Sequence, residues 1–478
     1  MKLHLFKAGI MLTLCNFSVN VSAQVKLASI FTDDMVLQQQ SQVPVWGWDA
    51  AGKSINVRTS WNNKQYKTKA DASGRWKVKV ATPTAGGPYM LTIDDGKTIK
   101  LNNVMIGEVW LCTGQSNMEM PMKGFKGQPI AGSTEAILHS QNNNIRIYTV
   151  PRSSKTEQQD NSKPSVWHVA SPEYVSNFSA TGYYFGRQLN QVLNVPVGLI
   201  NVSYGGSTIE AWMDPDVLKA FPEIKIPAKT DSIKVVNRTP TTLYNGMLNP
   251  VIGYGIKGCI WYQGESNYDR PDQYEKLFPA MVNRWRELWG EGEFPFYYAQ
   301  IAPYDYAQLP PYRSGGKYNS AYIREAQRKS LNVIPNSGMA VLMDIGEQAT
   351  IHPSHKEAGG TRLALLALGK TYGIKGGFGF ASPQYESITI NGNIAVIKFQ
   401  NAPNGLTTFG KELNNFEIAG KDQVFHQAKA VISGSSVSVS ASDVKEPVAV
   451  RYAFRDFIVG ELFGTDGLPV SSFRTDSW

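Results

Sequence analysis

Hydrophobic and polar positions alternate along residues 25–103, in short runs separated by turn residues. The clearest runs lie at 43–48, 55–59, 76–80 and 89–93. Gly, Pro, Asp and Ser stand between them, as in Asp94-Asp-Gly96. Regular short strands with turns of this kind are typical of a β-sandwich. We therefore predict an amino-terminal β-sandwich domain over residues 24–103.

From residue 104 the pattern changes to continuous apolar runs that alternate with stretches of helical periodicity. The apolar runs lie at 109–112, 197–203, 256–262, 296–301 and 339–343, and the helical stretches at 182–193, 273–288, 321–331 and 356–372. This alternation predicts a mostly parallel sheet that is covered by helices on both faces. We predict an α/β domain over 104–375, with an insertion at about 216–243, and a carboxyl-terminal β-rich region over 376–478.

The first residues have the features of a secretory signal. Lys2 and Lys7 flank a short apolar run, and Val21-Ser-Ala23 provides a small-residue cleavage site. We predict a signal peptide at residues 1–23, cleaved after Ala23, and hence a secreted or periplasmic protein. Its removal takes away two lysines and no acid, so the net charge falls from +8 to +6. No later run is apolar enough to span a membrane, and the scattered Lys and Arg do not favour nucleic acid as a partner.

Only Cys112 and Cys259 remain after the signal peptide, and both lie in apolar runs. We expect buried thiols that pack as small hydrophobic groups. A disulfide between neighbouring strands is the less favoured alternative in an oxidising compartment. Neither a CxxC motif nor clustered histidines accompany them, so no zinc site is expected. The sequence carries no signal for oligomeric state.

Ser116 follows the apolar run 109–112 in Thr113-Gly-Gln-Ser-Asn117. Open α/β sheets bind their ligands at the carboxyl ends of the strands, which is where this hydroxyl is expected. A serine hydroxyl needs a base to become a nucleophile. Of the six histidines, His352 stands in a loop between the run 339–343 and the next helix, so it can reach that edge. His355 is expected to enter the helix.

Two further strand ends offer hydrogen-bond donors for an oxyanion. Gly205 and Gly206 follow the run 197–203, and paired glycines allow a backbone N–H to approach a substrate closely. Gln263 and Asn267 follow the run 256–262 and offer side-chain amides. A plain turn at the glycines, and a buried glutamine that bonds only to backbone, remain as alternatives.

Together these segments resemble the SGNH hydrolases and, more specifically, the sialate O-acetylesterase family. The resemblance is carried by residues 106–118, 201–212, 244–250, 261–267, 324–327, Asp344-Ile-Gly-Glu347 and Ile351-His-Pro353, with 31–38 and 43–48 near the amino end and 467–475 near the carboxyl end. It thus covers nearly the whole chain after residue 23. It implies an SGNH-type, flavodoxin-like sheet and removal of acetyl groups from sugar hydroxyls.

The resemblance also implies roles for individual residues. Ser116 is expected to attack the acetyl carbonyl and His352 to act as general base. The N–H groups of Ser116 and of Gly205 or Gly206 are expected to bind the oxyanion together with the amide of Gln263. Gln115 and Asn267 are expected to contact the substrate. This mechanism requires no metal or organic cofactor.

One position departs from the family pattern. Many members carry aspartate two residues before the histidine, where this chain has Thr350. A backbone carbonyl near Thr350 could accept the histidine N–H and give a Ser-His dyad, which we favour because acetyl esters are activated relative to amides. Alternatively Glu347 or Glu265 reaches the imidazole, or catalysis is impaired.

The sequence therefore supports a carbohydrate O-acetylesterase that works through a serine acyl-enzyme, with sialate 9-O-acetylesterase as the first candidate. A first alternative keeps the chemistry but changes the substrate to an acetylated plant polysaccharide of the xylan type. A second alternative, motivated by Thr350, is a catalytically weak carbohydrate-binding protein. An O-acetylated sugar is the expected ligand in each case.

Overall fold

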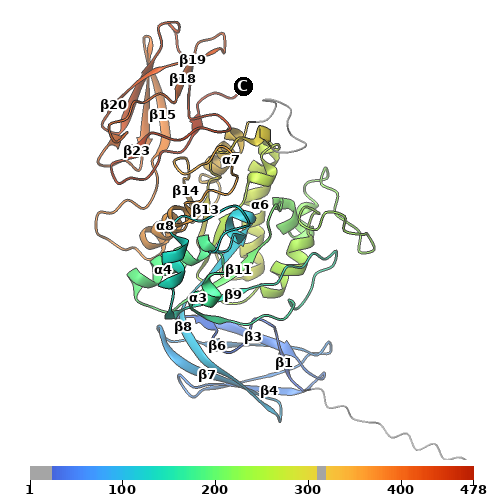
Figure 1. The fold of residues 1–478 in the computed structure, drawn as a ribbon. Helices are drawn as coiled ribbons and strands as arrows, with labels where there is room; N and C mark the ends of the chain where they lie inside the picture. Colours follow the sequence, from blue (N-terminus) through green and yellow to red (C-terminus); the bar gives the residue numbers. More distant parts are fainter. Residues whose placement is uncertain (1–23, 309–318) are drawn as a thin grey trace, which may run out of the picture.

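The computed structural model describes residues 24–308 and 319–478. Three tiers follow one another along the molecule: a β-tier at the amino end, a central α/β tier, and a β-tier at the carboxyl end (Figure 1). The predicted signal peptide at 1–23 lies outside the described residues. Within the part of the chain that is described, no helix is both long and apolar enough to cross a membrane.

The amino-terminal tier consists of two small sheets whose buried faces meet. Its strands are β1 (Lys26–Leu27), β2 (Val36–Gln38), β3 (Gln42–Trp48), β4 (Ser54–Thr59), β5 (Gln65–Lys69), β6 (Arg75–Ala81) and β7 (Gly86–Asp94). The order β1-β3-β6 forms one sheet, while β4 pairs with β5 and β7 in the other. The four predicted runs became strands, with Ile55 and Val57 buried along β4. The short polar strand β5 was not predicted.

Strand β8 (Thr98–Gly114) passes from the first tier into the second without a break. Its first half pairs with β7 and β2, and its second half lies at the centre of the parallel sheet, between β11 and β12. The change of pattern at residue 104 therefore falls within a strand. This continuous strand fixes Ser116, which follows its end, to both tiers.

The central sheet has the order β10-β9-β11-β8-β12-β13-β14, parallel from β9 to β14. Its remaining strands are β9 (Asn142–Thr149), the antiparallel edge β10 (His168–Ala170), β11 (Val197–Ser203), β12 (Gly258–Tyr262), β13 (Phe296–Ala299) and β14 (Ser337–Ala340). The predicted mixed α/β architecture is thus confirmed. Strand β11 spans the predicted run, whereas β9 and β10 were not predicted.

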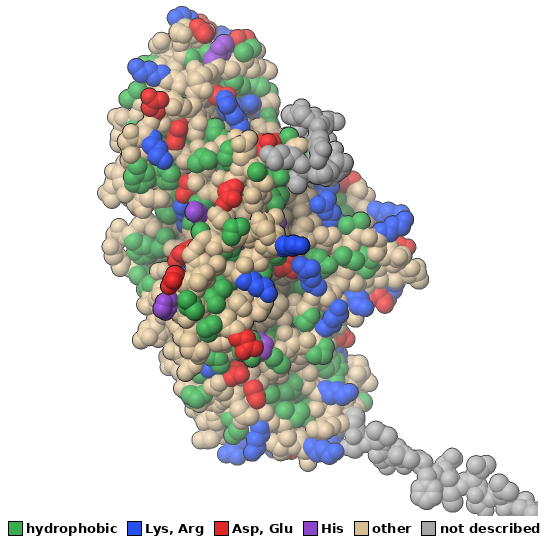
Figure 2. Space-filling model, viewed as in Figure 1, with side chains coloured by type: hydrophobic (Ala, Val, Ile, Leu, Met, Phe, Trp, Pro, Cys, Tyr) green, Lys and Arg blue, Asp and Glu red, His purple; other side chains and the backbone are tan. Residues whose placement is uncertain are grey.

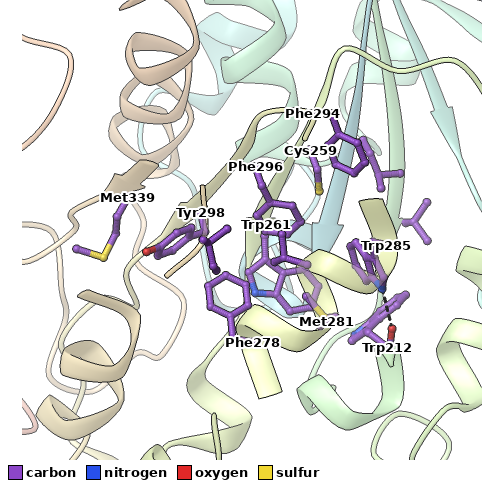
Figure 3. Close-up of a cluster of buried hydrophobic side chains, with 14 of the residues drawn as sticks. Trp212, Cys259, Trp261, Phe278, Met281, Trp285, Phe294, Phe296, Tyr298 and Met339 are labelled. Atoms are coloured by element: carbon purple, nitrogen blue, oxygen red, sulfur yellow. Dashed lines mark hydrogen bonds between the residues drawn. The ribbon is translucent and has the colours of Figure 1, made fainter. Parts of the chain in front are cut away.

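Helices cover both faces of this sheet. α4 (Ala180–Leu193) and α8 (Lys356–Leu366) bury one set of alternating strand residues, while α6 (Pro271–Trp289) and α7 (Ala321–Ser330) cover the other. On the α6 face, Trp261, Phe278 and Trp285 form an aromatic core (Figure 3). The indole N–H of Trp285 donates to the carbonyl of Trp212 at 3.2 Å. Each fully buried aromatic side chain contributes about 2–3 kcal/mol of transfer free energy.

Shorter helical segments connect these elements. They are α1 (Ser116–Glu119), α2 (Ser133–Leu138), α3 (Pro172–Val175), α5 (Pro215–Leu218), η1 (Ile209–Trp212), η2 (Tyr244–Leu248), η3 (Asn249–Val251), η4 (Glu265–Asn267), η5 (Tyr306–Gln308) and η6 (Ala367–Thr371). The helix predicted over 356–372 ends its α-helical part at Leu366 and continues as the π-helical turn η6. Strand β14 ends at Ala340, three residues before the predicted end.

The carboxyl-terminal tier is made of antiparallel strands, as the pattern beyond residue 376 predicts. One sheet has the order β15 (Gln384–Asn391), β16 (Ile394–Gln400), β21 (Ser436–Ser440), β20 (Lys429–Ser433); another has β19 (Phe425–Gln427), β18 (Phe416–Ala419), β22 (Ala449–Tyr452), β24 (Phe473–Arg474); β17 (Leu406–Thr407) pairs with β23 (Phe463–Gly464). The segment before β24 joins this tier to the α/β tier, because Ser471 accepts a hydrogen bond from Gln300 at 2.8 Å.

The two cysteines confirm the expectation of buried thiols. Cys112 on β8 and Cys259 on β12 are both free and fully buried. The alternative of a disulfide between neighbouring strands is wrong for this structure. Burial raises the pKa of both thiols, as expected for groups that are removed from water.

Candidate active site

The end of β8 is pressed against β12, and this contact positions Ser116. Gly114 has φ of 138° and, in place of its hydrogen, a Cβ would lie 2.2 Å from the carbonyl oxygen of Tyr262. Only glycine fits so close an approach. The next N–H, of Gln115, donates to the same carbonyl at 2.9 Å. Ser116 then opens α1 and keeps 9% of its surface exposed.

A cavity of about 390 Å³ lies at this edge of the sheet. Six residues that the sequence singles out line it: Gln115, Ser116, Gly205, Gly206, Glu265 and His352. They come from loops after β8, β11, β12 and β14, so the carboxyl ends of four parallel strands meet here. Charged side chains also line the cavity, among them Glu119, Arg152, Arg238 and Asp269. On the face shown in Figure 2, Lys and Arg are spread over the three tiers and interspersed with Asp and Glu.

The imidazole of His352 is held by an amide. Its Nδ1 lies 2.6 Å from Oε1 of Gln128, and its ring packs edge-on against Phe125 with 5.3 Å between centroids. An amide oxygen can only accept, so the proton of the neutral ring resides on Nδ1 and Nε2 is left as the basic nitrogen. Burial, together with the positive charge of Lys356, lowers the pKa of His352 to about 4. The ring is therefore neutral at pH 7, as a general base must be.

None of the three residues expected to orient the histidine does so within residues 24–308 and 319–478. The N–H of Thr350 donates to the carbonyl of Glu347 at 3.4 Å, and Oε1 of Glu347 accepts the N–H of Ser354 at 2.7 Å. Oε1 of Glu265 accepts from Asn117 at 2.5 Å. The expected backbone carbonyl is likewise replaced by Gln128, which lies 224 residues from His352 in sequence.

The glycine loop is held from both sides. The N–H of Gly205 donates to Oε2 of Glu119 at 2.7 Å, and Arg152 binds both oxygens of that carboxylate at 2.6 Å. The carbonyls of Gly205 and Gly206 accept from Asn237 at 2.7 Å and Arg238 at 3.2 Å. The N–H of Gly206 forms no hydrogen bond with another described residue. Since Asn237 and Arg238 lie in the predicted insertion, that segment helps to build the site.

Gln263 and Asn267 do not line the cavity. The amide nitrogen of Gln263 donates to the carbonyl of Ser207 at 3.1 Å and to Oδ1 of Asn267 at 2.7 Å. Asn267 in turn donates to Glu210 at 3.0 Å. Both amides thus tie the end of β12 to the glycine loop, which agrees with the structural alternative for Gln263 better than with an oxyanion donor. Gln115 does face the cavity, with Oε1 accepting from the N–H of Ser266 at 3.2 Å.

Comparison with known proteins assigns the chain to a family. Residues 106–366 match the family model described as carbohydrate esterase, sialic acid-specific acetylesterase. The chain belongs to this family. It is 30% identical to human sialate O-acetylesterase over 76% of this chain and 74% of that protein, and 28% identical to the mouse sialate O-acetylesterase over 77% of each. A carbohydrate acetylesterase from Xanthomonas citri has the same fold, with a TM-score of 0.86 and 35% identity over 95% of this chain and 100% of the other.

This carbohydrate esterase contains site residues that the sequence pattern did not reveal. They are Gln128, which contacts His352, Asn117 and Lys356, which lie beside the serine and histidine loops, and the Glu119–Arg152 pair at the glycine loop. The only sequence feature that could have pointed to Lys356 is its place four residues after His352. A lysine is expected at the surface, so its burial could not be inferred. Among the described residues, no group of three or more His, Cys, Asp and Glu is arranged to hold a metal ion.

Proposed function

We propose that this carbohydrate O-acetylesterase cleaves acetyl esters through an acyl-enzyme on Ser116, with His352 as the general base. The observation that carries the proposal is one cavity lined by Ser116, by a neutral His352 fixed through Gln128, and by the glycine loop. Such an arrangement of nucleophile, base and orienting group is recognised by geometry and roles rather than by sequence order.

The reaction proceeds in two halves. Ser116 Oγ attacks the acetyl carbonyl carbon and passes its proton to Nε2 of His352. The tetrahedral oxyanion collapses, the ester C–O bond breaks, and the imidazolium gives its proton to the departing sugar oxygen. Water then attacks the acetyl-enzyme, His352 takes a proton from it, and acetate leaves as the proton returns to Ser116 Oγ.

The oxyanion is stabilised by backbone N–H groups. Those of Ser116 and Gly206 have no partner among the described residues and are the first donors. The N–H of Gly205 becomes a donor only when the carboxylate of Glu119 releases it. One donor of this kind contributes about 3–4 kcal/mol of transition-state stabilisation. Gln263 then has only a supporting role. The proposed set of catalytic groups corresponds to the SGNH arrangement without an aspartate partner for the histidine.

We propose 9-O-acetylated sialic acid as the first substrate. Arg238 lines the cavity, its Nε donates to the carbonyl of Gly206, and its guanidinium forms no ion pair with a described residue. A cation that is not neutralised suits the carboxylate of an acidic sugar. Arg152, in contrast, is already paired with Glu119.

A xylan-type polysaccharide is the second candidate. A neighbouring cavity of about 320 Å³ shares Arg238, Ser266 and Asp269 with the catalytic one, so a longer sugar chain has room to continue.

The alternative of a catalytically weak carbohydrate-binding protein loses its motivation, because Gln128 orients His352 where Thr350 does not.

Acetate release from 9-O-acetylated sialic acid and from acetylated xylan, measured in parallel, tests the substrate. We expect a higher kcat/KM on the sialic acid, and we expect Arg238→Gln to raise KM for the sialic acid more than for xylan, because Arg238 also donates to the carbonyl of Gly206, which serves both substrates. A higher kcat/KM on xylan would assign the second candidate. Acetate release no greater than that of Ser116→Ala on either sugar would refute the proposal.

A further inference from the structure

A buried amide and two opposite charges lie beside both catalytic residues. Asn117, next to Ser116, donates from Nδ2 to Oε1 of Glu265 at 2.5 Å and to the carbonyl of Ile351 at 3.1 Å. Ile351 directly precedes His352. Nζ of Lys356 donates to Oδ1 of Asn117. One side chain thus connects the nucleophile turn to the histidine loop.

The cost of this arrangement indicates that it does more than fill space. Lys356 is 2% exposed and Glu265 is 3% exposed. Burial lowers the pKa of Lys356 to about 7 and raises the pKa of Glu265. The second carboxylate oxygen of Glu265 is buried without a hydrogen-bond partner among the described residues. A well-packed apolar pair is often as stable as a buried ion pair or more so, so stability alone does not account for these charges.

We propose that Asn117, Lys356 and Glu265 are positioning residues, which hold the Ser116 turn and the His352 loop at the separation that proton transfer requires. The proposal rests on the assignment of Ser116 and His352 as nucleophile and base. Asn117 supplies the link between the loops. Lys356 and Glu265 hold the two ends of its amide and so fix its orientation.

The same cluster acts on the charge state of the base. The charged and titratable groups near Lys356 are Glu265, Glu347 and the phenol of Tyr262. Those around His352 and its cavity are Lys356, Glu119, Arg152, Arg238 and Asp269. Lys356 is the charge that acts on the pKa of His352, and it lowers it. Removal of this cation therefore raises the pKa of the base.

Two variants separate the link from the charges. Asn117→Leu removes the link and keeps both charges. Lys356→Met with Glu265→Gln removes the charges as a pair and retains an acceptor for Asn117. The matched control is Arg362→Met with Asp344→Asn, because that pair also anchors α8, through bonds of 2.6 and 2.7 Å, and does not line the cavity.

The test measures three quantities for each variant. They are kcat and KM for a small acetyl ester, the pH profile of kcat/KM, and the rate at which a fluorophosphonate labels Ser116. Both cluster variants are expected to lose about 100-fold in kcat and in labelling rate, because a misplacement of the reacting groups by about 1 Å costs about 100-fold in rate. KM is expected to change less than about threefold. Only the charge-pair variant is expected to move the acid limb of the profile to higher pH. The control keeps wild-type kcat.

The idea is overturned if both variants melt cooperatively and retain kcat and labelling within about threefold of wild type. It is also overturned if the control loses as much kcat as the cluster variants. Failure of the proposed function would show itself separately, as acetate release by Ser116→Ala.

Discussion

Nδ1 of His352 lies 2.6 Å from the side-chain oxygen of Gln128, in the place where the family pattern leads one to expect a carboxylate. An amide oxygen fixes the same tautomer as a carboxylate but carries no charge. The base is therefore oriented without electrostatic support for its protonated form. Three predictions about catalysis follow from this contact and from the groups around it.

Gln128→Ala should lower kcat on an acetyl ester by about 100-fold, because the free ring adopts the wrong tautomer and orientation for part of the time. Gln128→Glu should retain most activity at pH 8 and move the acid limb of kcat/KM to higher pH, because a carboxylate stabilises the imidazolium. Steady-state kinetics on both variants checks this. Unchanged kcat in Gln128→Ala would show that another group orients His352.

The pH dependence of the free enzyme should reflect the lowered pKa of His352. The base must be neutral, and its pKa is about 4, so kcat/KM should be level from pH 7 to 5 and fall as the pH drops through 4. An acid limb near pH 6.5, the value of an ordinary histidine, would contradict this.

The free energy of unfolding should also depend on the protonation of His352. Between pH 6.5 and 4 the unfolded chain binds the proton that folded His352 refuses, so the free energy of unfolding should fall as the pH falls through this window. Denaturant unfolding of wild type and His352→Asn at pH 7 and 4.5 measures this. The loss of stability should be smaller in the variant, and an equal loss in both proteins would contradict the assignment.

Glu119 should compete with the oxyanion. Its carboxylate occupies the N–H of Gly205 at 2.7 Å, so Glu119→Ala frees a donor and removes a like charge. A boronic acid that forms a tetrahedral anion on Ser116 should bind about tenfold tighter, which corresponds to about 1.4 kcal/mol. Arg152→Met is the control, since it leaves Glu119 in place. Equal or weaker inhibition in Glu119→Ala would refute the idea.

Much of the framework was predictable because its signals are local. The run 197–203 is apolar at successive positions, as a strand buried on both faces must be, and it became β11. The same logic located Ser116 and His352, since strand ends in one parallel sheet meet at one edge. Strand β9 was missed, because its first residues are Asn142, Asn143 and Asn144 and suggest a turn.

The contacts that tune the site were not predictable, because they join distant segments. Gln128 has no pattern that marks it, and only the folded chain brings it to His352. Lys356 opens a helix, where a lysine is normally solvated. Gln263 illustrates the opposite case, in which the sequence suggests a role in the site that the structure does not favour. Its amide stands at a strand end, but the amide nitrogen is already bound to Ser207 and Asn267.

Acetate release by Ser116→Ala is the most direct test of the central claim. The variant should melt at the wild-type temperature within a few degrees, because only one oxygen atom is removed beside an open cavity. Its kcat on an O-acetylated sugar should fall by at least about 10⁴-fold, as for loss of the nucleophile in other serine hydrolases. Acetate release within tenfold of wild type would show that Ser116 is not the nucleophile and that the chemistry of this cavity must be assigned anew.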